Sequence, residues 1–423
     1  MKFIMERIEN HKRGSLTIVG SGIKAVSHLT LEALNYIDNA DIVYYTVSDP
    51  ETEMLIRKRN PNSIDLYEWY DDNKLREETY IQMAEMMLQS VRSGKNTVGV
   101  FYGNPAVFAA PTHRAINIAK SEGYEVKMLP GISSIDCLFA DLGVDPAVSG
   151  CQIFEASDLL LHNRQVNLDQ QLIILQAGSV GNFGFNFKGF NNDKLDVLID
   201  FLIDKYGGAH EVIHYIANIF FFQQPLIERT TLFELKNSKK ILNGISTLYI
   251  PPKTKKPLDK YYIEKLGFGE DDIEEKTDTE IYGDRERFFI SKMQFHKTPE
   301  NYKPVKASWA FYEAIYRLST SVKLLNEFES DPARTIDKYF PSLNEDEKFA
   351  LLSKQAGVVK LIMQGYTRDD IFRIYGATAT NSVGPNSPAM HVTVIVSHIE
   401  EDVRVVQSSR VNLNSSKWRK INE

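Results

Sequence analysis

Three tyrosines and one arginine in a short stretch of the chain could act together as a base: Tyr67, Tyr70, Arg76 and Tyr80. The phenol of a free tyrosine has a pKa of about 10. A neighbouring guanidinium stabilises the phenolate and lowers that pKa, and it can also stabilise negative charge that develops on a substrate oxygen. Taken alone, this spacing is more often that of core aromatic residues beside a surface ion pair, so the surrounding sequence must decide.

A predicted helix would place two of these side chains together. The apolar positions after Arg76 have helical spacing: Tyr80, Met83, Met87 and Val91. Asp72 or Asn73 could cap the start of this helix. Arg76 and Tyr80 would then lie one turn apart on the same face.

Residues 15–250 alternate between strand and helix patterns, which is typical of an α/β fold. Short runs rich in β-branched residues predict strands at 15–19, 41–46, 97–101, 126–129, 172–175, 212–216 and 244–250. Helical spacing occurs at 29–37, 111–121 and 134–142. We therefore expect helices packed around open sheets.

Four segments with small, kinked or hydroxyl-bearing residues lie at or near the ends of these strands. They are residues 102–105, 130–134, 176–178 and 246–247. Ligands of α/β sheets bind at the carboxyl ends of the strands, and glycine and proline let the backbone approach a ligand there. The turn Gly20-Ser21-Gly22 is weaker evidence, because it lacks the third glycine of a dinucleotide-binding loop.

These loops resemble those of the tetrapyrrole (corrin/porphyrin) methylase superfamily, over about residues 14–252. The resemblance implies two α/β subdomains that hold S-adenosylmethionine (SAM) between them. Two loops depart from the usual pattern. Gly20-Ser-Gly22 is not followed by Gly-Asp, and Asn104 stands where an acid is common. Such departures fit a changed substrate, because these loops face it.

A longer resemblance is to the borosin family, in which a peptide-backbone N-methyltransferase is fused to its own substrate. It is carried by residues 14–20, 100–103, 119–124, 128–131, 136–142, 155–158, 185–190, 214–217 and 246–252. Little in the structure or chemistry of the fold requires this particular sequence at Asp136-Cys-Leu-Phe-Ala-Asp-Leu142, so its match indicates common descent.

The borosin resemblance implies repeated SAM-dependent N-methylation of backbone amides in the protein's own C-terminal peptide, a precursor of a ribosomally made natural product. An amide nitrogen is a poor nucleophile because its lone pair is delocalised, so a base and a stabiliser of carbonyl charge are needed. The resemblance implies that Tyr67, Tyr70, Arg76 and Tyr80 are catalytic. We expect Tyr80 or Tyr70 to accept the proton and Arg76 to bind the carbonyl oxygen.

The same resemblance implies a SAM pocket of eight residues: Tyr102, Asn104, Val107, Ser134, Gln176, Ala217, Ser246 and Thr247. Core packing is the simpler explanation for Val107 and Ala217 when each is taken alone. His113, His214 and His296 lack metal-ligand spacing, so no metal is expected. We interpret His214 as a packed strand residue.

The sequence pattern changes after Pro252. The predicted domains are a methyltransferase domain (1–252), an extended clasp or arm (253–304), a small all-helical domain (305–376), and a flexible linker with the substrate peptide (377–423). Asp331-Pro332 and Asn344 begin two of the predicted helices. A further helix is predicted from apolar residues spaced three and four positions apart: Trp309, Tyr312, Ile315, Tyr316 and Leu318.

The segment 391–399, His-Val-Thr-Val-Ile-Val-Ser-His-Ile, predicts a β-strand when taken alone. It follows residues 376–390, which have the composition of a flexible linker, and this position is the one expected of a core peptide. We expect methylation at Val392, Thr393, Val394, Ile395, Val396, Ser397, His398 and Ile399, with some positions skipped. The polar tail after residue 400 departs from the family pattern.

The resemblance also implies partners: an interlocked homodimer in which each subunit modifies the other's tail, and a protease that releases the peptide. The net charge of −7 without a basic face gives no reason to expect nucleic acid. Without a signal peptide or a membrane span, we expect a cytoplasmic protein. Two alternatives stay open: a methyltransferase of tetrapyrroles or corrinoids, and a binding protein with an inactive methylase fold. Retention of the four catalytic residues argues against the second.

Overall fold

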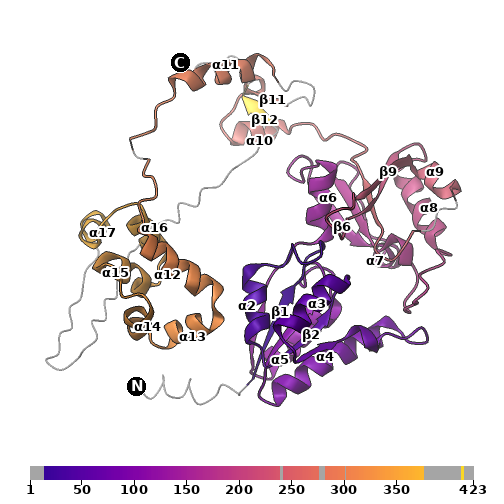
Figure 1. The fold of residues 1–423 in the computed structure, drawn as a ribbon. Coiled ribbons are helices and arrows are strands. Elements are labelled where there is room, and N and C mark those ends of the chain that lie inside the picture. Colours follow the sequence, from indigo (N-terminus) through magenta and orange to yellow (C-terminus); the bar gives the residue numbers. More distant parts are fainter. Residues whose placement is uncertain (1–13, 239–241, 276–281, 301, 376–410, 414–423) are drawn as a thin grey trace. The chain divides into compact units, whose positions relative to one another are not determined.

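The computed structural model describes residues 14–238, 242–275, 282–300, 302–375 and 411–413. The chain forms two compact units, Met1–Glu270 and Asp271–Glu423. The first unit contains two five-stranded sheets, and the second is largely helical (Figure 1). In the described part of the chain, no helix combines the length and the apolar character needed to cross a bilayer. The predicted domain boundaries at 252, 304 and 376 stay predictions.

The first sheet is entirely parallel, in the strand order β3-β2-β4-β1-β5. Its strands are β1 (Ser15–Gly20), β2 (Ile42–Thr46), β3 (Ser63–Asp65), β4 (Asn96–Phe101) and β5 (Glu125–Met128). Its helices are α2 (Leu31–Asn39), α3 (Pro50–Arg59), α4 (Arg76–Arg92) and α5 (Ala110–Ser121). The four strands predicted in this region are confirmed. The edge strand β3 was missed, because three residues are too few to show a period.

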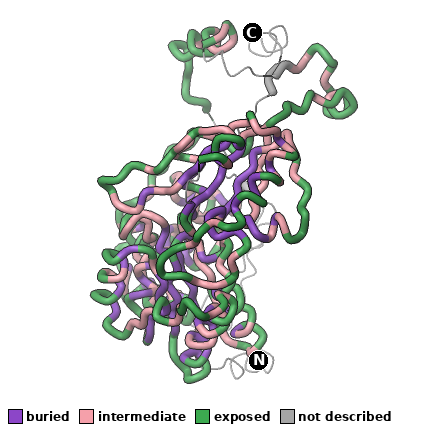
Figure 2. The backbone as a smooth tube through the Cα atoms, turned by 90° about the vertical axis from the view of Figure 1, so that its right-hand side faces the viewer, coloured by how far each residue is buried: buried purple, intermediate pink, exposed green. Residues whose placement is uncertain are grey.

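Alternate residues of this sheet face two separate cores, because successive side chains of a strand point to opposite faces. Leu16, Ile18 and Tyr44 pack against α4 and α5, whereas Val19 and Val43 pack against α2 and α3. Figure 2 shows the resulting buried strands in the middle of the unit. Coverage of both faces is typical of parallel sheets.

The second sheet mixes strand directions, in the order β6-β7-β10-β8-β9. Its strands are β6 (Cys151–Glu155), β7 (Gln171–Leu175), β8 (Glu211–Ile216), β9 (Leu226–Thr231) and β10 (Thr247–Ile250). Its helices are α6 (Ser134–Leu142), α7 (Ala156–Leu161), α8 (Leu195–Tyr206) and α9 (Leu232–Asn237). Because β10 is antiparallel to β7 and β8, its first residue lies at the edge where those two strands end.

The strand predicted at 244–250 is therefore shorter than expected. It begins at Thr247, and the residues before it form a turn in which the N–H of Ser246 donates to the carbonyl of Asn243 at 3.1 Å. The prediction that Ser246 lies inside a strand was wrong, because a β-branched run shows where a strand is favoured but not where a turn interrupts it.

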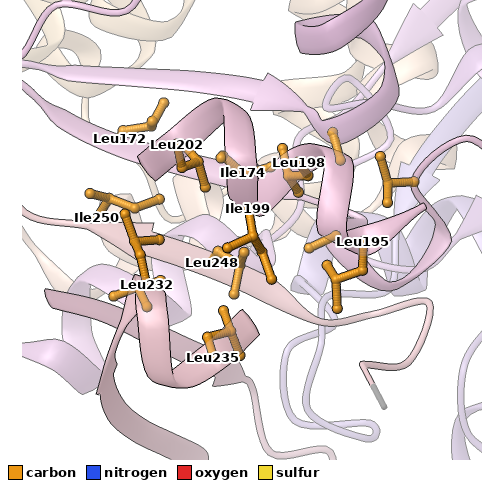
Figure 3. Close-up of a cluster of buried hydrophobic side chains, with 14 of the residues drawn as sticks. Leu172, Ile174, Leu195, Leu198, Ile199, Leu202, Leu232, Leu235, Leu248 and Ile250 are labelled. Atoms are coloured by element: carbon orange, nitrogen blue, oxygen red, sulfur yellow. The ribbon is translucent and has the colours of Figure 1, made fainter. Parts of the chain in front are cut away.

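The two faces of the second sheet are covered by different helices. Leu172, Ile174 and Leu248 pack against α7, α8 and α9 in the cluster shown in Figure 3. Ile173 and Tyr249, on the other face, pack against α6. Since α6 follows the last strand of the first sheet in the sequence, it links the two sheets.

Three loops of the first sheet touch one another where only glycine fits. A Cβ atom on Gly20 would lie 2.4 Å from the carbonyl oxygen of Gly103 and 2.8 Å from the Cα atom of Gly131. A Cβ atom on Gly131 would meet the same carbonyl at 2.4 Å. The absence of a side chain thus lets the loops after β1, β4 and β5 pack together.

The segment after β10 forms short elements that bury little. They are α10 (Lys260–Lys265), β11 (Ile273–Glu275) and α11 (Asp284–Lys292). Every residue of α10 and α11 is half-buried or exposed. A three-residue strand, β12 (Val411–Leu413), pairs with β11 in an antiparallel manner.

Six helices of the second unit share one core. They are α12 (Trp309–Thr320), α13 (Val322–Ser330), α14 (Pro332–Tyr339), α15 (Glu345–Ser353), α16 (Ala356–Met363) and α17 (Arg368–Tyr375). Asp331 and Asn344 cap α14 and α15, as predicted. In α12, Phe311 is in the core, whereas Trp309 is 83% exposed and Tyr312 is exposed beside it. The helical spacing predicted α12 but not which of its two apolar rows faces inward.

Candidate active site

The three tyrosines predicted to be catalytic form one aromatic cluster. Tyr67 lies in a 3-10 turn (Tyr67–Trp69), Tyr70 follows that turn, and Tyr80 lies one turn into α4. Ring centroids are 5.2 Å apart for Tyr67 and Tyr70, and 6.4 Å apart for Tyr70 and Tyr80. A side-chain hydrogen bond with Tyr80 is one of the causes that raise the pKa of Tyr70. The structure therefore brings these predicted residues together.

Arg76 is the first residue of α4, one turn before Tyr80, as the spacing predicted. Its Nη2 donates to the main-chain oxygen of Asn182 at 2.5 Å, and its backbone N–H donates to the oxygen of Phe183 at 2.9 Å. The guanidinium carbon also lies 5.9 Å from the ring centroid of Phe190. A guanidinium at this position can therefore hold the carbonyl of a peptide bond.

Residues 182–190, here called the clamp loop, reach from the second sheet's subdomain to the start of α4. Gly184 forms a backbone bridge with Leu75, and the carboxylate of Asp72 accepts from the N–H of Phe187 at 2.7 Å. The prediction that Asp72 or Asn73 caps α4 was wrong: α4 begins after Leu75 without a side-chain cap. Asp72 fixes the clamp loop instead.

The clamp loop completes the aromatic cluster. Phe185 stacks on Tyr70, with centroids 4.3 Å apart and planes inclined by 28°, and it meets the edge of Tyr67 at 5.9 Å. Phe187 contacts Phe185 at 4.9 Å. Side chains separated by more than a hundred residues in sequence thus set the position of the Tyr70 ring.

Burial determines the protonation of Tyr70. Loss of solvent raises the pKa of Tyr70 far above its usual value, the neighbouring phenols raise it further, and Arg76 lowers it by less. Burial and Asp65 also raise the pKa of Tyr67. Arg76 lowers the pKa of Tyr70, as expected of an adjacent guanidinium. Burial and the neighbouring phenols raise that pKa by more, so the net effect is opposite to the expected one. Tyr70 is a neutral phenol.

A cavity lies where the loops of the two sheets meet. Seven of the eight residues predicted to bind the cofactor line it: Tyr102, Asn104, Val107, Ser134, Gln176, Ala217 and Thr247. The other lining residues were not predicted: Ile23, Ser48, Gly103, Phe108, Ser133, Leu175, Ile216, Ile219, Gly244 and Ile245. Most of these are neighbours of predicted residues in the same loops. Extending the prediction to every residue near the strand ends would therefore have included them.

Ser246 is the predicted cofactor residue that the structure does not bring to the cavity. It is fully buried, and its Oγ lies 2.8 Å from Nε2 of His214 and accepts from the N–H of Asn243 at 3.0 Å. Nδ1 of His214 lies 2.9 Å from a carboxylate oxygen of Glu228. His214 is a packed strand residue, as predicted, but it also holds the turn that leads into the cavity wall at Ile245.

Two lining residues adopt a backbone conformation that favours glycine. Gln176 has a φ of 58° and Phe108 has a φ of 51°. Each such residue costs on the order of 1–3 kcal/mol, and such residues persist mainly at functional sites where the surrounding structure holds them. Their strain marks the loops after β4 and β7 as parts of a ligand site.

The chemistry of the wall fits a flat base joined to a short thioether chain. All of the lining residues are uncharged, and they combine aliphatic side chains with hydroxyls, two carboxamides and glycine backbone. Such a wall suits apolar contact and backbone hydrogen bonds, and it offers a phosphate group no cation. Among the described residues, no group of three His, Cys, Asp or Glu side chains is placed to hold a metal ion.

Tyr102 belongs to both parts of the site. It lines the cavity, and its phenol interacts electrostatically with Tyr70, Tyr80 and Arg76. The cavity and the tyrosine–arginine cluster are therefore one continuous site. The expected substrate residues, 392–399, lie outside the described residues.

Two family profiles match this chain. The profile of the tetrapyrrole (corrin/porphyrin) methylases covers residues 15–236, and the profile of the borosin biosynthesis clasp domain covers residues 281–400. The first match agrees with the α/β fold that the strand pattern predicted and with the superfamily that the loops resemble.

Several proteins are similar over most of their length. One from Coprinopsis marcescibilis, named as a methyltransferase and ribosomally synthesized type I borosin cyclic peptide precursor, is 44% identical over 82% of this chain and 92% of its own. The similarly named dendrothelin A precursor of Dendrothele bispora is 41% identical over 85% of this chain and 90% of its own. The omphalotin A precursor of Omphalotus olearius is 40% identical over the same shares.

Proposed function

Because this chain belongs to the borosin family of methyltransferases fused to ribosomally synthesized peptide precursors, we propose that it N-methylates backbone amides in its own C-terminal segment, residues 392–399. Family membership makes the chain a SAM-dependent methyltransferase. The bond that is methylated, the repetition along the tail and the positions within it are our proposal.

The observation that carries this proposal is the environment of Arg76. Its guanidinium donates to the main-chain carbonyl of Asn182, which is chemically the same group as the carbonyl of a substrate amide. Tyr80 lies one turn further along α4, and Tyr102 connects both to the cavity. The cluster therefore offers a carbonyl-binding group and a phenolic base beside a cofactor cavity, as amide methylation requires.

The residues of the cavity fit SAM. The uncharged wall would hold the adenine and the thioether chain, with Gln176, Asn104 and Thr247 offering polar groups and the glycine backbone at Gly103 and Gly244 allowing close approach. When bound, SAM supplies an electrophilic methyl carbon on a sulfonium and leaves as S-adenosylhomocysteine.

The other catalytic roles belong to residues of the chain. Arg76 holds the carbonyl oxygen as charge moves onto it. Tyr80 accepts the amide proton, and Tyr70 lies beside it as a neutral phenol. The deprotonated amide nitrogen would then take the methyl group that SAM supplies when bound. Because Tyr70 keeps its proton, the base is assigned to Tyr80 rather than to Tyr70.

We also propose that the enzyme acts as a homodimer whose subunits exchange tails. The arm supports this arrangement, because it exposes large apolar side chains: Tyr282, Met293 and Phe295 are 66%, 72% and 74% exposed. Large apolar side chains gain free energy when they are removed from water. A second copy of the chain would cover them.

The decisive experiment is mass spectrometry of the purified full chain, before and after incubation with SAM. Mass additions in steps of one methyl group, placed on backbone nitrogens of residues 392–399 by fragmentation, are the expected result. An unmodified tail after prolonged incubation would contradict the proposal.

Two variants separate this function from its alternatives. Arg76→Ala should abolish tail methylation while SAM binding, measured by calorimetry, persists, because Arg76 does not line the cavity. Deletion of residues 385–423 should remove the substrate. Retained turnover of SAM with a tetrapyrrole by that deletion variant would instead support a small-molecule methyltransferase. Failure of the full chain to bind SAM would support an inactive methylase fold.

A further inference from the structure

The tail returns to the described structure beyond the segment that we expect to be methylated. Within the second unit, β12 pairs with β11 in an antiparallel manner, with Ile273 opposite Leu413, Glu274 opposite Asn412 and Glu275 opposite Val411. Figure 1 shows β12 beside β11. The clasp-domain profile ends at residue 400, so this pairing involves a part of the tail that the profile does not cover.

The pairing has the form by which folded domains capture extended peptides. A peptide that adds a strand to a free sheet edge gains affinity from main-chain hydrogen bonds, and alternate side chains give specificity. In the described residues β11 pairs with β12 alone, in a sheet of two strands. The register pairs positions 411 and 413 with positions 275 and 273, as main-chain hydrogen bonding between two antiparallel strands requires. The segment that pairs reads Val-Asn-Leu in the sequence.

We propose that Val411–Leu413 is a docking strand that binds the tail to the arm beyond the methylated segment. The substrate segment then lies in the sequence between two points of attachment to the folded chain, α17 before it and β12 after it. The presentation of a substrate rests on the proposed function, whereas the docking of β12 on β11 does not.

The docking is weak enough to be reversible. A sheet of two three-residue strands is marginal in water. Because β12 belongs to the same chain as β11, its effective concentration is on the order of millimolar. Pairing of this strength can release and re-form, which suits a tail that must advance through an active site.

Proline variants of the full chain test the docking. Successive N–H groups point to opposite sides of a strand, so one of Asn412→Pro and Leu413→Pro removes an N–H that pairs with β11. Ser408→Pro is the matched control, because it changes the same tail outside β12. Hydrogen exchange of the amides of residues 273–275 reports the pairing, and mass spectrometry reports the rate of tail methylation.

We expect amide exchange at residues 273–275 to rise about tenfold in at least one strand variant and methylation to slow roughly three- to tenfold, with the control within about twofold of wild type. Unchanged exchange in both strand variants would overturn the docking. Faster exchange with an unchanged methylation rate would overturn its part in substrate presentation. If the wild-type tail is never methylated, the proposed function fails, and the exchange data still decide the docking.

Discussion

At the scale of single residues, Tyr70 and Tyr80 share a hydrogen bond but have different surroundings. Tyr70 is half-buried and stacked on Phe185, and loss of solvent raises its pKa, whereas Tyr80 lies one turn into α4. Tyr80→Phe should lower the methylation rate by at least about 100-fold, because it removes the base. Tyr70→Phe should lower it by about tenfold, because only one hydrogen bond with that base is lost. Single-turnover rates of tail methylation, followed by mass, measure both.

The pH dependence gives a second check on this pair. Burial raises the pKa of Tyr70, so Tyr70 keeps its proton through neutral and mildly alkaline pH and is not the group that titrates there. Tyr70→Phe should therefore lower the methylation rate without changing the shape of the pH–rate profile in this range. Loss of an ionisation from the profile of Tyr70→Phe would show that Tyr70 is the group that titrates and that the assignment is wrong.

His214 does not line the cofactor cavity, but we expect it to affect cofactor binding. It is 3% exposed and connects Glu228 to Ser246, whose main chain and Oγ hold the turn that contains Gly244 and Ile245. His214→Ala should weaken SAM binding about tenfold, because the turn loses its buried support and Ser246 loses a partner. Calorimetric affinity for SAM is the measurement.

SAM affinity and melting temperature together separate support of the turn by His214 from mere packing in the sheet. His214→Gln places an amide near the position of Nε2 and should restore much of the SAM affinity, because it can again bind Ser246. The melting temperature is recorded for both variants. A lower melting temperature with unchanged SAM affinity would mean that His214 only packs the sheet.

At the scale of elements, the clamp loop makes one active site out of two subdomains. Phe185 stacks on Tyr70, whereas Phe187 is 57% exposed and contacts Tyr67 and Phe185 but not Tyr70. Phe185→Ala should lower the methylation rate about tenfold or more, because the Tyr70 ring loses the surface that orients it. Phe187→Ala, the matched control, should have a smaller effect. Neither residue lines the cavity, so SAM affinity should be unchanged in both variants.

A volume-conserving variant separates orientation from loss of packing. Phe185→Leu keeps an apolar side chain at the same place, and it should retain more activity than Phe185→Ala if the ring is only held in position. Equal methylation rates for Phe185→Ala, Phe187→Ala and wild type would show that the clamp loop does not orient the site.

The elements were predictable where a local pattern fixes them. The strands at 15–19 and 97–101 follow from β-branched runs, and α15 follows from the capping residues Asn344 and Glu347. The loops after β4 and β7 were also predictable as ligand loops, because proline and glycine follow a buried strand there. Both kinds of signal depend only on neighbours in the sequence.

The remaining features depend on contacts between distant residues. The clamp loop meets α4 through Asp72 and Phe187, and no periodicity connects two segments so far apart. Ser246 faces His214 because β10 is antiparallel and starts late, which the β-branched run did not reveal. The left-handed backbone at Gln176 had no signal, because the sequence has no glycine at that position.

At the scale of the whole molecule, the enzyme and the substrate that we propose for it share one chain, so the geometry of the tail decides which site it can reach. The arm exposes Met293 and Phe295, as expected of a surface that a second copy covers. The β11–β12 pairing lies within one chain and holds the tail near its own arm. If the arm in turn packs on the partner, the docked tail is delivered to the partner's active site.

Complementation in a defined heterodimer tests this delivery. One subunit carries Arg76→Ala and an intact tail, the other is active but lacks residues 385–423, and two different tags isolate the mixed dimer after co-expression. The intact tail should be methylated, because its own active site is dead and the partner's is not. Its rate should be independent of protein concentration, since the transfer occurs within one dimer, whereas collision between separate dimers would slow on dilution. An unmethylated tail in the mixed dimer, beside a methylated wild-type tail, would show that each subunit modifies its own tail and that the exposed face of the arm serves another purpose.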